Sequence, residues 1–181
     1  MSDPRVIETE RLILRPTAAE DVGPWIAMMG DEQTARFLGG VQPRQVAWRG
    51  CMAMAGAWSL TGVAMFSVVE KATGRWIGRL GPWTPDGWPG TEVGWTIVRE
   101  AWGKGYATEG AAAAMDYAID VLGWSEIIHV IDPANAPSQR VAERLGSTNL
   151  RPGRLPAPFD GVTVDIWGQS ADAWRARRRS A

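Results

Sequence analysis

The segment from Thr91 to Gly123 reads TEVGWTIVREAWGKGYATEGAAAAMDYAIDVLG and joins a strand pattern to a helix pattern through a glycine-rich turn. Alternation over residues 91–98 predicts a strand, and the apolar periodicity of residues 106–122 predicts a helix. Gly103 and Gly105 stand where that helix must begin, although glycine costs backbone entropy there. Their placement indicates a turn whose backbone N–H groups must approach something bulky.

The spacing of this turn excludes one kind of phosphate site and disfavours another. A P-loop needs Gly-Lys-Ser or Gly-Lys-Thr at its end, whereas Gly105 is followed by Tyr106. A dinucleotide fingerprint needs a small third residue, where this chain has Thr108. The remaining interpretations are a turn that binds a pyrophosphate through N–H groups of residues 103–108, with Lys104 adding a charge, and a plain structural connection. Spacing alone leaves both open.

The rest of the chain predicts one mixed α/β domain. Strands are expected at residues 11–15, 63–70, 75–80, 126–131 and 162–169, and helices at residues 17–29, 43–60 and 135–145. Thr17 and Glu20 have the spacing of a capping box, and Asn135 is expected to cap the helix that follows it. Residues 81–90, GPWTPDGWPG, are expected to be an irregular loop.

Composition indicates an ordinary globular protein of 181 residues, with 45% hydrophobic and 22% charged residues. No apolar run approaches the roughly 20 residues that span a membrane, and the N-terminus has no signal-peptide pattern. The lone Cys51 excludes an intramolecular disulfide and a cysteine-based zinc cluster, so no metal is expected. We expect a cytoplasmic protein, and arginine-rich, lysine-poor usage hints at a bacterial source.

The C-terminal residues 170–181 form a basic tail with four arginines against one aspartate. Such a tail can contact nucleic acid, but a frayed, solvated terminus is the commoner case, so nucleic-acid binding is not expected. The whole chain, 1–181, is expected to be one domain with this tail appended, either as a monomer or as a homodimer.

The segment 91–123 resembles motif A of the GNAT acetyltransferase superfamily. The signature of that motif is [QR]-x-x-G-x-[GA], which this chain matches at Gly105 and Ala107. Trp102 replaces the first Gln or Arg, as is usual in the branch that resembles ribosomal-protein alanine N-acetyltransferases.

A second segment, residues 132–147, resembles motif B of the same branch and reads DPANAPSQRVAERLGS. Its matching positions are Asn135, Ser138, Glu143, Leu145 and Gly146, whereas Ser147 stands where the branch usually has an aromatic or bulky apolar residue. Residues 8–16, ETERLILRP, resemble the opening strand of the branch, so the resemblance covers about residues 8–169.

The resemblance implies a GNAT-type fold: a mostly antiparallel sheet with flanking helices, in which the strand at residues 91–98 splays from the parallel strand at 126–131. Acetyl-CoA is implied as the cosubstrate, with its pantetheine arm in the gap and its pyrophosphate on the glycine turn. The implied cofactor-binding residues are Thr96, Ile97, Val98, Trp102, Gly103, Lys104, Gly105, Tyr106, Ala107, Thr108, Asn135 and Ser138.

Acetyl transfer to an amine needs a base, a stabilised oxyanion and a proton for the leaving thiolate. Glu92 is the candidate base, or else a solvated glutamate at a strand end. The tyrosine that the family uses as proton donor is absent from the expected helix. Ser138 is the candidate in its place, or else a serine that caps the helix. An N–H near Ile97 is expected to meet the oxyanion.

Three further observations leave alternatives open. His129, the only histidine, is expected to pack in or beside the core rather than to act in catalysis. Trp83 and Trp88 are candidates for the wall of an acceptor pocket, and Trp95 is expected in the core. The leading hypothesis is an N-acetyltransferase that acts on a protein N-terminus or a small amine by direct attack. The alternative is a module that binds acetyl-CoA without turnover.

Overall fold

The computed structural model describes residues 5–180 and contains one eight-stranded sheet in the order β1-β2-β3-β4-β5-β6-β8-β7. The strands are β1 (Ile7–Glu8), β2 (Leu12–Arg15), β3 (Phe66–Glu70), β4 (Arg75–Trp83), β5 (Glu92–Ile97), β6 (Glu126–Ile131), β7 (Thr148–Arg154) and β8 (Thr163–Ser170). All neighbours are antiparallel except β5 and β6, which are parallel. The predicted mixed α/β fold is therefore confirmed.

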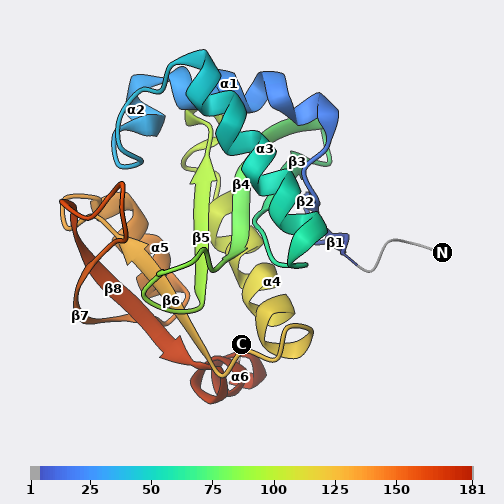
Figure 1. The fold of residues 1–181 in the computed structure, drawn as a ribbon. Helices are drawn as coiled ribbons and strands as arrows, with labels where there is room; N and C mark the ends of the chain where they lie inside the picture. Colours follow the sequence, from blue (N-terminus) through green and yellow to red (C-terminus); the bar gives the residue numbers. More distant parts are fainter. Residues whose placement is uncertain (1–4, 181) are drawn as a thin grey trace.

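Helices cover both faces of the sheet (Figure 1). The α-helices are α1 (Val22–Gly30), α2 (Glu32–Ala35), α3 (Arg44–Leu60), α4 (Tyr106–Asp120), α5 (Ala136–Arg144) and α6 (Ala171–Ser180), with short 3-10 turns at Ala19–Asp21 and Arg99–Ala101. Leu80 of β4 and Gly110 of α4 are in contact, so α4 lies on the face to which Leu80 points. Arg79 points to the other face, where it stacks on Trp25 of α1.

Helix α4 forms where its apolar stripe predicts it and buries that stripe against the sheet. The fully or nearly fully buried positions of the stripe are Ala111, Ala114, Met115, Ala118 and Ile119. The three alanines among them have small side chains, which allow α4 to lie close to β4 and β5. The start of α4 is thereby fixed directly beside the end of β5, which positions the glycine turn.

Strands β5 and β6 separate after a single ladder pair, Glu92 with Ile128. The Ile128 N–H donates to the carbonyl of Thr91 at 2.9 Å, and a regular parallel ladder would continue with the N–H of Val130 and the carbonyl of Val93. In Figure 1 the two strands diverge from that pair. The splayed pair implied by the resemblance is present.

Two local predictions are corrected by the structure. The capping box is shifted by one residue, because the Asp21 carboxylate accepts from the N–H of Ala18 at 2.8 Å and Thr17 lies outside it. Strand β4 continues to Trp83, into the stretch expected to be irregular. Pro82 is tolerated there because its partner Val93 turns its carbonyl toward β6, so β4 loses no ladder bond.

The predicted tail also differs, since Ala171–Ser180 forms helix α6 instead of a frayed terminus. Trp174 is buried, and its indole N–H donates to Asp116 of α4 at 2.7 Å. Arg175 and Arg178 pair with Asp120 and Asp116 of α4 at 3.1 and 2.9 Å. Much of the positive charge of this segment is therefore matched inside the molecule.

Two strands were missed altogether, β1 and β7. The residues of β7, TNLRPGR, lack alternation because nearly all of them are exposed on an edge strand. No helix among residues 5–180 is long and apolar enough to cross a membrane.

Candidate functional site

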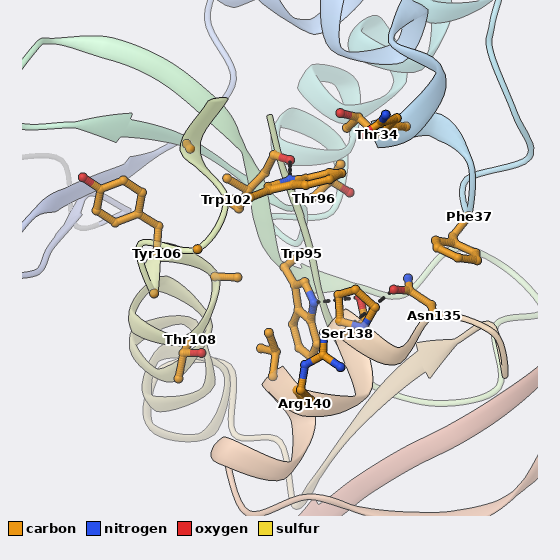
Figure 2. A pocket seen from close by; sticks show the side chains of 18 of the residues that line it. Thr34, Phe37, Trp95, Thr96, Trp102, Tyr106, Thr108, Asn135, Ser138 and Arg140 are labelled. Atoms are coloured by element: carbon orange, nitrogen blue, oxygen red, sulfur yellow. Dashed lines mark hydrogen bonds between the residues drawn. The ribbon is translucent and has the colours of Figure 1, made fainter. Parts of the chain in front are cut away.

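A cavity of about 400 Å³ lies where β5, the glycine turn, α5 and the α2 segment meet. Ten of the twelve residues proposed to bind the cofactor line it; the two that do not are Lys104 and Val98. Figure 2 shows the labelled side chains of these elements around the cavity. Residues far apart in the sequence are thus brought into one site.

The glycine turn presents an unfilled helix N-terminus to the cavity. Gly103 and Gly105 have φ of +74° and +82°, a region that favours glycine. The first hydrogen bond of α4 joins the N–H of Glu109 to the carbonyl of Gly105, and no side chain caps the helix. The N–H groups of residues 106–108 are the free donors of a first helical turn, which attract an anion.

Thr108 gives independent support for a ligand at this turn. Its hydroxyl is buried and has no hydrogen-bond partner among the described residues, yet Thr108 lines the cavity. Buried polar groups are rarely left unpaired. A phosphate oxygen at the helix N-terminus would supply the missing partner.

Lys104 lies outside the cavity. Its ammonium is 3.9 Å from the Glu70 carboxylate, and its carbonyl accepts from the guanidinium of Arg11 at 2.9 Å. Arg11 also pairs with Glu109 at 2.6 Å, which fixes the back of the turn to β2. Lys104 therefore stabilises the turn from behind.

The positive side chains that line the cavity are Arg140 and Arg144 of α5. They are four residues apart, so they share one face of the helix with Pro137 and Val141, which also line the cavity. Neither arginine was predicted as a site residue, although their i, i+4 spacing on the helix after Asn135 can be read from the sequence. They place two positive charges in the same cavity as the glycine turn.

Ser138 stands at the first turn of α5 with its hydroxyl directed into the site. Asn135 caps the helix, since its side-chain oxygen accepts from the N–H of Ser138 at 3.2 Å. The Ser138 hydroxyl instead accepts from the indole N–H of Trp95 at 3.3 Å (Figure 2). The hydroxyl proton of Ser138 therefore remains available for donation.

Side chains replace the ladder bonds that β5 and β6 would otherwise make. The N–H of Val130 donates to Oε1 of Glu92 at 3.1 Å. The carbonyl of Val93 accepts from Nδ1 of His129 at 2.7 Å. These two bonds hold the strands apart at the point where the cavity begins.

Glu92 is buried, with 5% of its surface exposed. Its Oε2 accepts from the indole N–H of Trp88 at 2.6 Å. Burial raises the pKa of Glu92 to about 7, although the bonds from Val130 and Trp88 and the charge of Arg79 act in the opposite direction. A carboxylate with this pKa can accept a proton near neutral pH.

Glu92 does not line the cavity itself; it lies at the start of β5, on the α1 side of the sheet. Gly94 leaves room for its carboxylate, because a Cβ there would lie 3.1 Å from Oε1. Thr96 is the next residue on the same face and does line the cavity. Any proton transfer between the cavity and Glu92 therefore needs an intervening group such as water.

His129 is a buried structural residue, as expected, with 1% of its surface exposed. Because the Val93 carbonyl can only accept, Nδ1 carries the proton, and Nε2 accepts from the Ser147 hydroxyl at 3.0 Å. Gln169 of β8 donates to Ser147 at 2.9 Å. The polar side chain of Ser147 thus serves as the hydrogen-bond partner of His129. Burial lowers the pKa of His129 to about 4.

Glu92 and His129 should have opposite effects on stability as pH changes. The pKa of Glu92 rises from 4.5 to about 7 on folding, so its contribution is full below pH 4.5 and is lost toward pH 7. The pKa of His129 falls from 6.5 to about 4, so its contribution is full above pH 6.5 and is lost toward pH 4. Between pH 4.5 and pH 6.5 the stability contribution of Glu92 therefore falls as pH rises, while that of His129 increases.

We therefore expect Glu92→Gln to make stability more acid-sensitive. Relative to wild type, the free energy of unfolding of the variant should rise by about 2 kcal/mol more between pH 5 and pH 7. Urea unfolding at the two pH values measures this difference, with Glu126→Gln at the exposed start of β6 as the matched control. Equal pH dependence in Glu92→Gln and wild type would contradict the assignment.

One wall of the cavity was not anticipated from the sequence. It comes from Gln33, Thr34, Phe37 and Leu38, in and after the short helix α2. Asp31 caps that helix through the N–H of Thr34 at 2.8 Å. No local pattern marks these residues, because only the tertiary fold brings them opposite β5 and α5.

The three tryptophans near the loop have separate places. Trp88 contacts Glu92, Trp95 lines the cavity, and Trp83 packs against the main core. Trp95 packs against the core, as expected, and its half-buried side chain also lines the cavity.

Comparison with known proteins supports a common origin for this arrangement. The family described as acetyltransferase (GNAT) domain matches residues 11–148. An uncharacterized N-acetyltransferase, p20 from Bacillus licheniformis, is 31% identical over 140 residues, covering 76% of this chain and 79% of that protein. The uncharacterized protein YkkB of Bacillus subtilis is 36% identical over 87 residues, which cover 47% of this chain and 51% of YkkB. This chain thus matches about half the length of YkkB.

Solved structures have the same fold. An acetyltransferase from Agrobacterium tumefaciens has a TM-score of 0.79 at 28% identity, with 93% of this chain and 95% of that chain covered. A structure described as a putative ribosomal-protein-serine acetyltransferase from Vibrio cholerae has a TM-score of 0.76 at 21% identity, with 94% and 99% covered. At that identity the second likeness concerns the fold alone.

Proposed function

Because the chain belongs to the GNAT acetyltransferase family, we propose that it transfers the acetyl group of acetyl-CoA to a primary amine by direct attack. The observation that carries the proposal is the single cavity that joins the uncapped start of α4 to the gap between β5 and β6. A phosphate-binding turn and an open strand edge in one cavity suit a ligand that has both phosphates and an extended amide chain.

The phosphate end of acetyl-CoA is assigned to the glycine turn and to α5. The pyrophosphate would accept from the N–H groups of residues 106–108 and from the Thr108 hydroxyl. Arg140 and Arg144 would meet further phosphate charge, a role that Lys104 was expected to share. Asn135 is assigned to the cap of α5 instead of to a direct contact.

The pantetheine arm is assigned to the backbone of Trp95. The backbone N–H and carbonyl groups of successive β5 residues point alternately toward β4 and toward β6. The N–H of Val98 donates to the carbonyl of Ile77 at 2.9 Å, so those of the even-numbered residues point toward β4. The carbonyls of Val93 and Ile97 point the other way, since they accept from His129 and Trp102. The arm is therefore assigned to the edge of β5 that carries the backbone groups of Trp95, and not to the backbone of Thr96 or Val98, which faces β4.

The proposed reaction uses three groups of this chain. Glu92 takes a proton from the acceptor ammonium through water, and the free amine attacks the thioester carbon. The N–H of Ile97, which faces the gap, stabilises the oxyanion of the tetrahedral intermediate. The C–S bond then breaks, and the departing thiolate takes the proton of the Ser138 hydroxyl. Ser138 regains a proton, directly or through water, from the attacking nitrogen, which loses its second proton as the amide forms.

The acceptor is proposed to be a protein N-terminal amine or a small amine. The resemblance of residues 132–147 to ribosomal-protein acetyltransferases favours a protein N-terminus, and the Vibrio cholerae structure bears a related description. A module that binds acetyl-CoA without turnover is not favoured, because a carboxyl of pKa near 7 and a free serine hydroxyl are both in place.

Calorimetric titration with acetyl-CoA, and with NADH as the control ligand, tests the cofactor assignment. We expect micromolar or tighter binding of acetyl-CoA and none of NADH, followed by thiol release when amines and N-terminal peptides are screened. Failure to bind acetyl-CoA would remove the proposed function.

Ser138→Ala should lower kcat about 10²-fold, since general-acid groups contribute at least that much. The KM for acetyl-CoA should change little, because the hydroxyl acts at the thiolate. Thiol release under saturating acetyl-CoA measures the effect, with Gln139→Ala as control, since Gln139 is adjacent but does not line the cavity. Full activity of Ser138→Ala would assign the proton to solvent.

A further inference from the structure

The Trp102 side chain makes a hydrogen bond within the protein, which it would not need if its role were only to contact the cofactor. Its indole N–H donates to the carbonyl of Ile97 at 2.6 Å, linking the glycine turn back to β5 (Figure 2). Trp102 lines the cavity and has 47% of its surface exposed, so packing restrains only part of the side chain. The hydrogen bond to Ile97 therefore helps to fix the position of the ring.

The same edge of β5 offers three carbonyls to the gap, those of Val93, Trp95 and Ile97. His129 occupies the first at 2.7 Å, and Trp102 occupies the third at 2.6 Å. The middle carbonyl, that of Trp95, is left as the acceptor open to a ligand among the residues that the structure describes.

We propose that Trp102 is a positioning residue that, together with His129, restricts the acyl-CoA arm to one register on β5. This inference rests on the proposed function. Successive carbonyls on one strand edge are about 7 Å apart, so an arm paired at Ile97 would displace its acetyl group by that distance. With both outer carbonyls occupied, an amide N–H of the arm has one acceptor on this edge, and the thioester is held at one place relative to Ser138.

The phosphate-binding turn alone does not set this register. The arm between the pyrophosphate and the thioester is a flexible chain, which can compensate for a slip along the strand.

Two variants separate the effect of the Trp102 N–H donor from the effect of its aromatic ring. Trp102→Phe keeps an aromatic ring and removes the N–H, whereas Trp102→Gln removes the ring and keeps an N–H donor at a similar reach. The probe is acetyl-CoA carrying carbon-13 at the acetyl carbonyl, observed by NMR when bound to each protein. No acceptor amine is required.

Wild type and Trp102→Gln should each give one bound carbonyl resonance at the same chemical shift. Trp102→Phe should give two resonances or one broadened by exchange, with a calorimetric Kd for acetyl-CoA within about threefold of wild type. Once an acceptor is known, the kcat of Trp102→Phe should fall at least tenfold relative to wild type, while the KM of this variant changes little.

The proposal is overturned if Trp102→Phe gives a single sharp resonance at the wild-type shift, if it loses acetyl-CoA binding, or if Trp102→Gln behaves like Trp102→Phe. Loss of binding would make the residue a source of affinity, and the last outcome would make the ring the functional part. Failure of wild type to bind acetyl-CoA would instead refute the proposed function, so the two failures are distinct.

Discussion

Glu92→Gln should lower kcat by about 10²- to 10⁴-fold, the usual contribution of a general base. Glutamine can still accept a hydrogen bond from Val130 or Trp88, so the start of β5 should keep its shape, but it cannot take a proton. The Kd for acetyl-CoA should stay within about threefold, because Glu92 does not line the cavity. The rate of thiol release as a function of pH measures both effects.

The pH profile is the sharper test of this assignment. In wild type, kcat/KM should rise through pH 7, where Glu92 loses its proton, and this rise should be absent from Glu92→Gln. Glu126→Gln, which lies at the exposed start of β6, should behave as wild type. A variant Glu92→Gln as fast as wild type would mean that the carboxylate only bridges the two strands and that water serves as the base.

Gly105→Glu should weaken acetyl-CoA binding by at least about 100-fold, which corresponds to about 2.7 kcal/mol. The new side chain forces a residue with a Cβ into φ of +82° and brings a negative charge to the start of α4. Both effects oppose a pyrophosphate that approaches the N–H groups of the first turn. Calorimetry with acetyl-CoA gives the change in Kd.

Gly123→Glu is the matched control for this substitution. Gly123 has φ of +72°, lies beyond the opposite end of α4 and has open space around it, so the two changes cost similar backbone strain. Gly105 lines the cavity, whereas Gly123 does not. If both variants lose affinity equally, the loss reflects destabilised folding and the glycine turn is not the phosphate site.

Features that depend on a few adjacent residues could be predicted from the sequence. The turn at Gly103 and Gly105, the cap at Asn135 and the buried stripe of α4 each follow from local backbone and packing rules. The capping box near Thr17 was misplaced by one residue because Asp21 is an equally good partner one position later. Local rules therefore identify the element more reliably than its first residue.

Features that depend on the tertiary fold could not be predicted. Phe37, which follows α2, lines the cavity together with residues of β5 and α5, and no local pattern reveals that the fold brings them together. The arginines of α6 read as a solvated tail, since the carboxylates that neutralise them are more than fifty residues away on α4. Ser147 departed from the expected motif because its partner is His129 on another strand.

The position of β8 between β6 and β7 has a consequence for the order in which the chain matures during synthesis. Strands β1 to β5 pair with sequence neighbours and can assemble as soon as they leave the ribosome. β7 pairs only with β8, the last strand to be made, so β6 and β7 wait with open edges until Thr163–Ser170 emerges. A nascent chain that stalls before residue 163 would expose two unpaired strand edges, which makes it a candidate for aggregation and for chaperone binding.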